Sequence, residues 1–432
     1  MTEHCARTGR GTYYPVMNAT LLKTIGAVLV LGFVQPVVRA AEAGDDILAF
    51  DAFGTLGVVH SSEGRADFTR NTLVPSGAGA SQDWSPKVDS VLAGQVSARF
   101  TRQLSAVLQV VSEQRDDDSY RPRIEWANIK YEITPDLTVA AGRIVSPILM
   151  LTDTRRISFA HPWIRPPQEV YELYPVTNND GVNLRWRVRL GGTTHLMDLA
   201  YGSSDTHYSR NGSAGAARAR KQFLLRSTLE RGALSFSVGY SPAELTLPAF
   251  GPLFDAFRQF GAPGEAIAER YSAEHRSTRY IGAGVNYDPG RWFAMGEWAQ
   301  VKIKGVLGGH WGWYASTGLR IGSITPYMIW AQTRPSRQRS EPGLDLDTLP
   351  PESVPVAAAL NAQLNAALAN VPDQTTLSAG VRWDFARSLC LKLQYDHVDL
   401  ASGNAGTLTN FQSGFQSGGK LNVLGVSVSF VL

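Results

Sequence analysis

The sequence has 432 residues and lacks three features that would place it in common classes of protein. It has only two cysteines, Cys5 and Cys390, too few for a disulfide framework. Beyond residue 40 it has no run of 18 apolar residues, so it offers no transmembrane helix there. It also lacks a basic surplus after residue 40, because residues 1–40 hold four basic residues and one acidic residue and so account for the whole net charge of +3. A nucleic-acid partner, which needs such a surplus, is therefore not expected.

Residues 17–43 have the pattern of a secretory signal peptide. Lys23 supplies a positive start, and residues 25–34 form a short apolar stretch. Small residues ending at Ala40 or at Ala43 then offer a cleavage site. The apolar stretch is too short to span a membrane comfortably, so a membrane anchor is the weaker interpretation.

Two parts of the chain are therefore expected. Residues 1–43 form a precursor segment that is removed on export, with Met17 as an alternative start because residues 1–16 are unlike the beginning of a signal peptide. Residues 44–432 form a single domain.

Apolar and polar residues alternate from residue 47 onward in segments of about ten residues, which is typical of strands that cross a membrane. The clearest case is 181–190, where Val182, Leu184, Trp186, Val188 and Leu190 take one face and Asn183, Arg185, Arg187 and Arg189 take the other. Tryptophans on apolar faces suit the aromatic girdles of a membrane barrel. A soluble β-sandwich also alternates, so this pattern alone does not decide the fold.

The spacing of the links between strands decides the fold class. We predict about sixteen strands, near 47–60, 88–100, 104–114, 121–133, 137–146, 180–190, 193–203, 219–231, 233–242, 275–288, 291–304, 310–322, 324–334, 374–386, 389–400 and 420–432. Short turns alternate with longer links, near 61–87, 115–120, 147–179, 204–218, 243–274, 305–309, 335–373 and 401–419. This rhythm predicts an all-β fold: a transmembrane antiparallel β-barrel with short periplasmic turns and long extracellular loops. An even number of strands lets the ring close, which lipid requires.

Two of the long links contain predicted helices. Residues 354–371, within a loop at about 350–372, carry Ala and Leu at helical spacing. Residues 252–271 are read as a second helical segment. We expect the first helix to cap the barrel mouth, because helix propensity alone explains its composition. A helix that binds a partner or gates the pore is the alternative.

Several segments resemble the Gram-negative outer-membrane porins, and together they extend over nearly all of the chain after the signal peptide. They are 50–57 (FDAFGTLG), 124–127 (IEWA), 141–143 (AGR), 380–385 (GVRWDF), 391–396 (LKLQYD) and 426–430 (VSVSF). One departure is the final residue, Leu432, where such barrels usually end in an aromatic residue that assists assembly. The resemblance implies a sixteen-stranded, trimeric barrel whose third long loop, here 147–179, folds into the pore and narrows it.

The candidate site residues are charged side chains that we expect to face the pore. In loop 147–179 they are Asp153, Arg155, Arg156, Arg165, Glu169 and Glu172, and on the strands they are Arg143, Arg185, Arg187, Arg189, Arg226, Arg320, Arg382 and Asp384. Arg185, Arg187 and Arg189 take consecutive inward positions, and like charges so close would be costly in a dry core. They therefore indicate a water-filled interior. The sequence leaves open whether they give a modest anion preference or are neutralised by carboxylates on neighbouring strands.

These expectations describe a channel and not an enzyme. The chain would let small hydrophilic solutes and ions diffuse through the outer membrane of a Gram-negative bacterium, with no catalytic residue, cofactor or metal. Its other expected partners are outer-membrane lipid, lipopolysaccharide and, by the resemblance, two further copies of itself. The main alternative is a channel specific for a small anion or sugar. Further alternatives are an adhesin and a barrel enzyme, which would need a pair such as His310 with Ser316 or His195 with Asp198.

Overall fold

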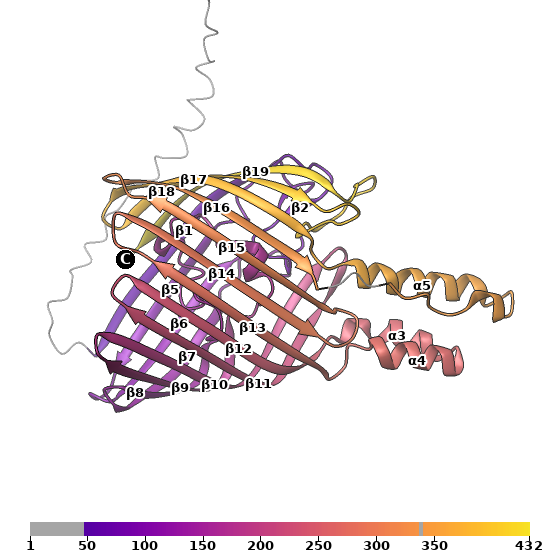
Figure 1. The fold of residues 1–432 in the computed structure, drawn as a ribbon, viewed down its shortest axis with the longest axis horizontal. Coiled ribbons are helices and arrows are strands. Elements are labelled where there is room, and N and C mark those ends of the chain that lie inside the picture. Colours follow the sequence, from indigo (N-terminus) through magenta and orange to yellow (C-terminus); the bar gives the residue numbers. More distant parts are fainter. Residues whose placement is uncertain (1–46, 337–339) are drawn as a thin grey trace, which may run out of the picture. The chain divides into compact units, whose positions relative to one another are not determined.

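The computed structural model describes residues 47–336 and 340–432, and within them sixteen long strands form one closed antiparallel barrel (Figure 1). They are β1 (Leu48–Ser61), β5 (Val91–Arg99), β6 (Leu104–Glu113), β7 (Arg123–Thr134), β8 (Leu137–Val145), β9 (Asn178–Leu190), β10 (Thr193–Arg210), β11 (Ser213–Arg231), β12 (Leu234–Thr246), β13 (Arg276–Tyr287), β14 (Trp292–Ile303), β15 (Gly309–Leu319), β16 (Ile324–Pro335), β17 (Gln374–Ala386), β18 (Leu389–Leu400) and β19 (Gly419–Val431). β1 pairs with β5 on one side and with β19 on the other, so the ring has no free edge. The predicted fold class is confirmed. The predicted signal peptide lies outside the described residues.

One predicted link is wrong. Residues 204–218 were expected to form a long loop, but β10 and β11 extend toward each other until only Asn211 and Gly212 remain as a turn. Both have positive φ angles, 51° and 76°, as a tight two-residue hairpin turn requires. The pairing of β10 with β11 shifts between Gly202 and Ser204. Such a bulge interrupts the alternation on which the prediction rested.

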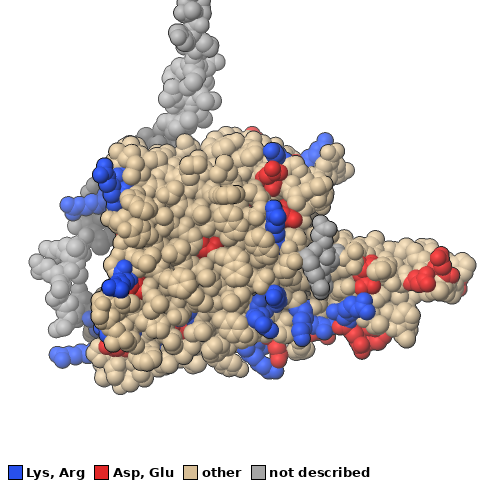
Figure 2. Space-filling view, in the orientation of Figure 1, with Lys and Arg blue, Asp and Glu red and all other residues tan. Residues whose placement is uncertain are grey.

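The outer face of the barrel carries large exposed apolar side chains from its short-turn end to its middle. Phe50 and Leu190 keep 70% and 73% of their surface exposed, and Trp330 keeps 55%. Trp313 and Trp330 meet edge to face, with ring centroids 5.1 Å apart. Figure 2 shows few charged side chains on the wall between the two ends of the strands. An apolar surface of this extent is suited to hydrocarbon and not to water.

Three helices lie beyond the long-loop ends of the strands. They are α3 (Gly251–Arg258), α4 (Gly261–Tyr271) and α5 (Val354–Ala369), with the one-turn 3₁₀ helices η2 (Pro248–Phe250) and η3 (Leu346–Thr348) beside them. The buried side chains of α5, among them Leu360 and Leu364, pack in one cluster with Phe254, Phe257 and Ile267 of α3 and α4. The helices project from the rim (Figure 1) and do not cap the mouth as expected, because their apolar faces cover one another. No described helix has the length and apolarity needed to cross a membrane.

Residues 146–177, which we call the inner loop, fold into the barrel as predicted for the third long loop. The inner loop contains η1 (Ser158–Ala160) and α2 (Gln168–Tyr171). Trp163 and Val170 are completely buried and share one cluster with inward residues of β13 to β16, such as Tyr280 and Ile329. The part of the lumen in front of these strands is therefore a packed apolar core, where the sequence predicted water.

Glycines on the inner faces of two strands make room for this packing. A Cβ atom on Gly312 of β15 would lie 1.9 Å from the carbonyl oxygen of Glu169. One on Gly239 of β12 would lie 2.0 Å from the carbonyl oxygen of Ile148. Because these contacts are with backbone, no side-chain rotation relieves them. The glycines therefore fix how closely the inner loop approaches the wall.

Gly312→Ala should push the inner loop away from β15 and lower the free energy of unfolding by about 1–3 kcal/mol, the usual cost of overpacking. Urea titration in phospholipid vesicles measures this change. Gly94→Ala is the matched control, because its Cβ would meet nothing within 4 Å. Equal unfolding midpoints for the two variants would contradict the observed contact of the inner loop with β15.

Candidate functional site

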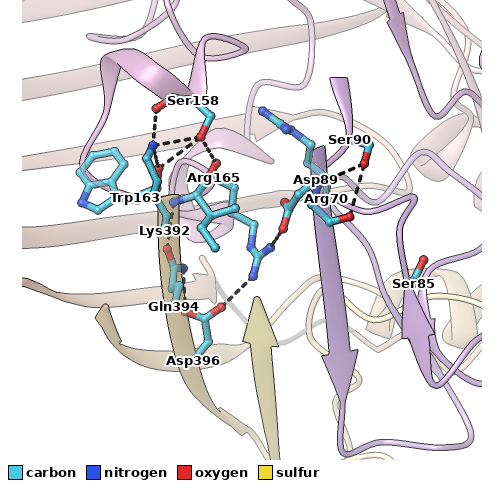
Figure 3. Close-up of polar contacts among 12 residues, drawn as sticks. Arg70, Ser85, Asp89, Ser90, Ser158, Trp163, Arg165, Lys392, Gln394 and Asp396 are labelled. Carbon is cyan, nitrogen blue, oxygen red and sulfur yellow. Dashed lines mark hydrogen bonds and ion pairs between the residues drawn. The ribbon is translucent and has the colours of Figure 1, made fainter. Parts of the chain in front are cut away.

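A buried arginine ties the inner loop to the barrel (Figure 3). Arg165 is 4% exposed, and its Nη1 and Nη2 donate to Asp89 Oδ2 at 2.5 Å and to Asp396 Oδ2 at 3.1 Å. Its guanidinium also lies 4.8 Å from the ring centre of Phe68. Asp89 belongs to residues 62–90, which we call the first loop, and Asp396 belongs to β18. One side chain therefore joins the inner loop, the first loop and the barrel wall.

Lys392 of β18 is a second anchor, visible beside Arg165 in Figure 3. It is completely buried, and its Nζ donates to Ser158 Oγ at 3.0 Å and to the carbonyl oxygens of Ser158, His161 and Trp163. Within the described residues no carboxylate lies at ion-pair distance from Nζ. Backbone carbonyls of the inner loop thus replace water around this ammonium group.

Arg382 lies below the inner loop, and Arg320 lies at the short-turn rim. Arg382 donates from Nη1 to the carbonyl oxygen of Phe159 at 2.5 Å and pairs with Asp384 at 2.6 Å, so it supports the loop from β17. Arg320 pairs with Asp288 at 2.6 Å, where both residues flank short turns. Arg320 is therefore far along the barrel from the inner loop.

The opposite side of the inner loop is held by Arg226 of β11. Arg226 is 8% exposed, and its guanidinium donates to the carbonyl oxygen of Leu149 at 3.2 Å, to Asp153 Oδ2 at 3.0 Å and to Asp198 Oδ2 at 3.2 Å. Burial raises the pKa of Asp153, but Arg226 and Arg185 together outweigh it and hold the pKa below its usual value. Asp153 is therefore a charged partner and not a neutral acid.

The two glutamates of the inner loop bond to neutral groups. Glu169 is 3% exposed, and its Oε1 accepts hydrogen bonds from Gln374 Nε2 at 2.8 Å and from the hydroxyl of Thr376. Glu172 Oε2 accepts from the backbone N and from Oγ1 of Thr72, at 2.8 and 3.0 Å. Burial raises the pKa of both carboxyls above the usual value. Glu169 is an anchor, whereas Glu172 lines a cavity described below.

Two neighbouring arginines of the inner loop have different partners. Arg156 places Nη2 2.7 Å from Glu113 and Nη1 2.6 Å from Glu125, and Arg123 of β7 joins the same cluster through Glu113. Arg155 has no carboxylate within ion-pair distance in the described chain; its Nη1 donates to a backbone carbonyl of the inner loop at 3.0 Å. The positive charge of Arg156 is neutralised locally, and that of Arg155 is not.

The three arginines of β9 run from the inner loop down to a short turn. Arg185 Nε donates to Asp198 at 2.7 Å and Arg189 pairs with Asp136 at 2.9 Å, whereas Arg187 has no ion pair among the described residues. Only Arg185 also approaches the inner loop, at 3.9 Å from the Asp153 carboxylate. The predicted ladder therefore meets the inner loop at one end only.

Arg143 of β8 lies at the upper rim of the wall. It pairs with Asp180 of β9, with Nε 2.8 Å from Oδ1. The next residue, Ile144, is the one that packs against the inner loop. Because neighbouring side chains point to opposite faces of a strand, the Arg143 side chain starts on the outer face of β8. It then extends toward the upper rim of the barrel.

A cavity of about 360 Å³ opens at the long-loop end of the barrel, and we call it the rim cavity. It lies between the first loop, the second loop (residues 114–122), the inner loop and the upper ends of β7 to β10. Of the described residues, seven arginines line it, Arg70, Arg115, Arg123, Arg143, Arg155, Arg156 and Arg165, with five carboxylates, Glu113, Asp116, Glu172, Asp180 and Asp205. Arginines therefore outnumber carboxylates in the lining, although Arg156 and Arg165 also pair with carboxylates just outside it.

A much smaller space of about 10 Å³ lies deeper, between the inner loop and the wall near Gln109, and is also lined by Arg155 and Arg156. It has room for about one water molecule. Asp153 lines it as well, and Arg185 lies 3.9 Å from the Asp153 carboxylate. Arg155 and Arg156 therefore line both spaces.

Sequence reasoning missed seven charged residues of the rim cavity, Arg70, Glu113, Arg115, Asp116, Arg123, Asp180 and Asp205. Glu113 is the last residue of β6 and Arg123 is the first residue of β7. The predicted strands therefore already placed these two residues beside one link. Arg70 gave no such signal, because its position in the cavity depends on how the first loop meets the inner loop.

Neither pair considered for catalysis is assembled in the described chain. His195 Nε2 lies 2.8 Å from Ser227 Oγ and not beside Asp198. Ser316 Oγ accepts from Trp163 Nε1 at 2.9 Å and donates to a backbone carbonyl at 3.0 Å. In the same described part, no group of three or more His, Cys, Asp or Glu side chains is arranged to hold a metal ion.

Comparisons with known proteins identify the fold. No protein-family model matches the chain, and no curated protein does. Among solved structures, the chain is similar to an anion-selective porin from Comamonas acidovorans, with 11% identity, a TM-score of 0.51, and 89% of this chain and 99% of that one covered. It is similar to Salmonella typhi OmpF, solved in complex with daunomycin, at 12% identity and a TM-score of 0.51 over 89% and 97% of the two chains. It is also similar to the outer-membrane channel DcaP of Acinetobacter baumannii, at 10% identity and a TM-score of 0.50 over 90% and 99%. The chain therefore has the fold of the sixteen-stranded outer-membrane porins.

Arg165→Met should lower the free energy of unfolding by about 3–5 kcal/mol, because it leaves the carboxylates of Asp89 and Asp396 buried without a cation. Urea titration in vesicles gives the value. Arg258→Met is the control: Arg258 has an exposed partner, Asp255 on α3, and its loss should cost about 0.5 kcal/mol or less. A similar small cost for both variants would contradict the anchoring role.

Proposed function

We propose that the chain is an outer-membrane porin through which small hydrophilic solutes and ions diffuse passively. The passage begins in the rim cavity, runs between the inner loop and the wall of β6 to β10, and leaves past Arg187 and Arg189. The inner loop is its constriction.

One observation carries this proposal, the unequal division of the lumen. The inner loop packs its apolar side chains mainly against β13 to β16, with fewer contacts from β8, β10 and β11. The charged side chains around the rim cavity lie at the upper ends of β7 to β10. Such a wall is costly where water is excluded and inexpensive where water is present. A wetted strip beside a packed one is what a narrowed diffusion pore requires.

A modest preference for anions follows from the charges without local partners. In the rim cavity, Arg70 and Arg155 have no ion pair among the described residues. Farther along, Arg187 has no ion pair among the described residues, whereas Arg185 and Arg189 do. Unneutralised positive charge along a narrow aqueous path attracts anions and repels cations.

The location and assembly are parts of the same proposal. The apolar outer band suits a lipid bilayer, with lipopolysaccharide as the lipid at the long-loop rim, and the signal-like segment at residues 17–43 suits export. A homotrimer follows from the resemblance of the sequence to the porins.

Conductance in planar bilayers tests the channel. The purified barrel should give stable, ohmic current steps, and a KCl gradient should give a reversal potential on the anion side. Arg187→Glu should move this potential toward cation preference, because it replaces an unpaired positive charge on the path by a negative one. Arg258→Glu, on α3 beyond the rim, should leave it unchanged. Absence of current steps from well-folded wild-type barrels would refute the channel, and an unshifted potential would remove Arg187 from the path.

Trimer formation has its own test. In mild detergent, light scattering combined with refractive index should give a protein mass three times that of the mature chain. The dissociated, heated sample supplies the one-chain reference. A mass of one chain before heating would refute the trimer and leave the conductance test unaffected.

A further inference from the structure

The β10–β11 hairpin continues well beyond the barrel wall. β10 pairs with β9 only as far as Ser203, and β11 pairs with β12 only from Arg218 onward. Beyond these points the two strands pair only with each other, around the turn at Asn211 and Gly212. We call residues 204–218 the strap. Strand edges without a partner are costly in hydrocarbon, so the strap belongs in water above the membrane.

The strap crosses the mouth of the barrel. Three hydrogen bonds hold its tip: Ser209 N donates to the carbonyl oxygen of Leu73 at 2.8 Å, Arg210 Nη2 donates to that of Leu408 at 3.5 Å, and Asn410 N donates to Asn211 Oδ1 at 2.7 Å. Leu408 and Asn410 belong to residues 401–418, which we call the last loop, between β18 and β19. In the ring, six long strands separate β10 from β19 on one side, and six separate β11 from β18 on the other. The tip therefore reaches the loop that lies diametrically opposite its base.

The first and last loops give the tip an ordered surface to bind. Their backbones exchange two hydrogen bonds between Asp67 and Thr409, at 2.8 and 3.0 Å. The side chain of Asn410 donates to Asp67 Oδ2 at 2.7 Å, and Asp67 is completely buried. Phe68 and Leu408 share an apolar cluster that joins the two loops to the wall. The tip is therefore bound to a packed surface and not to a free loop end.

The strap bends where it leaves the wall. The register between β10 and β11 shifts between Gly202 and Ser204, and the register between β11 and β12 shifts between Arg220 and Leu225. Lys221 lies within the second shift, and its φ angle of 51° is uncommon for any residue other than glycine. Bulges bend the strands that contain them and interrupt the hydrogen-bonded ladder. Two bulges at one level therefore form a hinge between the strap and the wall.

Little packing holds the strap apart from the bonds at its tip. None of residues 205–218 is buried. Tyr208 and Ala217 touch the cluster of the three helices, and both remain partly exposed. Segments with few buried apolar contacts are the ones that open locally while the rest of a protein stays folded. The tip can therefore leave the two loops without unfolding of the wall strands.

The strap forms one side of the rim cavity. Asp205, Thr206 and His207 line this cavity together with Leu73 of the first loop. Leu73 is also the residue to which Ser209 ties the tip. Release of the tip therefore removes a wall from the cavity at which the proposed passage begins.

We propose that the strap is a hinged gate at the mouth of the channel, closed while its tip is bound to the first and last loops and open when the tip is released. This inference rests on the proposed channel and adds its regulation. In the closed position the strap divides the mouth, so entry is limited to small solutes. In the open position the rim cavity widens, and the inner loop alone limits the size of the solute.

Locking the strap tests the gate. In a chain with Cys390→Ser, the pair Leu73→Cys and Ser209→Cys places two thiols at the bonded tip, and a short bis-maleimide joins them. The control is the same protein treated with N-ethylmaleimide, which modifies both thiols without joining them. Control barrels should visit a second, larger current level, and tethered barrels should lose it. In liposome swelling, tethered barrels should also lose the entry of the larger oligosaccharides.

The failures of the two proposals are distinguishable. Equal current levels and equal exclusion limits in tethered and control barrels would overturn the gate and leave the porin proposal standing. Absence of current from both would refute the channel, and the gate with it. Failure of the two thiols to join would contradict the bonded position of the tip.

Weakening the tip should have the opposite effect. Asn211→Gly keeps the turn, because glycine adopts a positive φ angle freely, and removes only the side chain that accepts from Asn410 N. The larger current level should become about fivefold more occupied, the factor that one net hydrogen bond carries. Ser213→Ala is the matched control, since Ser213 is exposed at the same tip and its side chain forms no hydrogen bond in the described chain. Equal occupancy in the two variants would overturn the role of the tip.

Hydrogen exchange on the unaltered protein gives a readout that depends on no variant and no current. The amides of Ser209 and Asn410 bond the tip to the two loops, whereas those of residues 193–202 bond within the wall. The tip amides should exchange at least about tenfold faster, because release of the strap exposes them and leaves the wall intact. Equal protection would show that the tip does not separate and would overturn the gate.

Discussion

In hydrocarbon, a strand has to pair its backbone N–H and C=O groups on both edges, since no water is present to replace a missing partner. The pairing of β1 with both β5 and β19 meets this demand for the whole ring. Once the ring is closed, the strand backbone needs no hydrogen bonds from the inner side chains. The inner face is then free to carry arginines, to pack a loop, or to do both in different sectors, and this chain does both.

The inner loop divides the interior because of residue size on the facing strands. Gly239 and Gly312 let its backbone touch β12 and β15, and apolar side chains fill what remains. Where the loop also meets charge, every contact adds hydrogen bonds, as with Arg165 between two carboxylates or Lys392 among carbonyl oxygens. These contacts hold the loop in one position, which a constriction needs if its width is to be constant.

The sequence was sufficient for the strands because each carries its own signal in the period of its side chains. It failed at 204–218, where a bulge breaks that period. The site was harder, because its properties depend on partners far away in the chain. The face of Arg185 could be predicted, but its pairing with Asp198 could not. Arg70 was missed altogether, since only the docking of the first loop brings it beside Arg155.

The number of arginines in a pore is a poor guide to its selectivity. Seven arginines line the rim cavity. Arg165 has only buried carboxylates as partners, and Arg156 is neutralised by two glutamates. A paired charge has a field that falls off over a few ångströms, whereas an unpaired one acts along the path until ions screen it. Selection among solutes therefore depends on the few side chains that the fold leaves without a partner. Among the described residues, Arg70 and Arg155 at the rim cavity and Arg187 on β9 are three arginines without an ion pair.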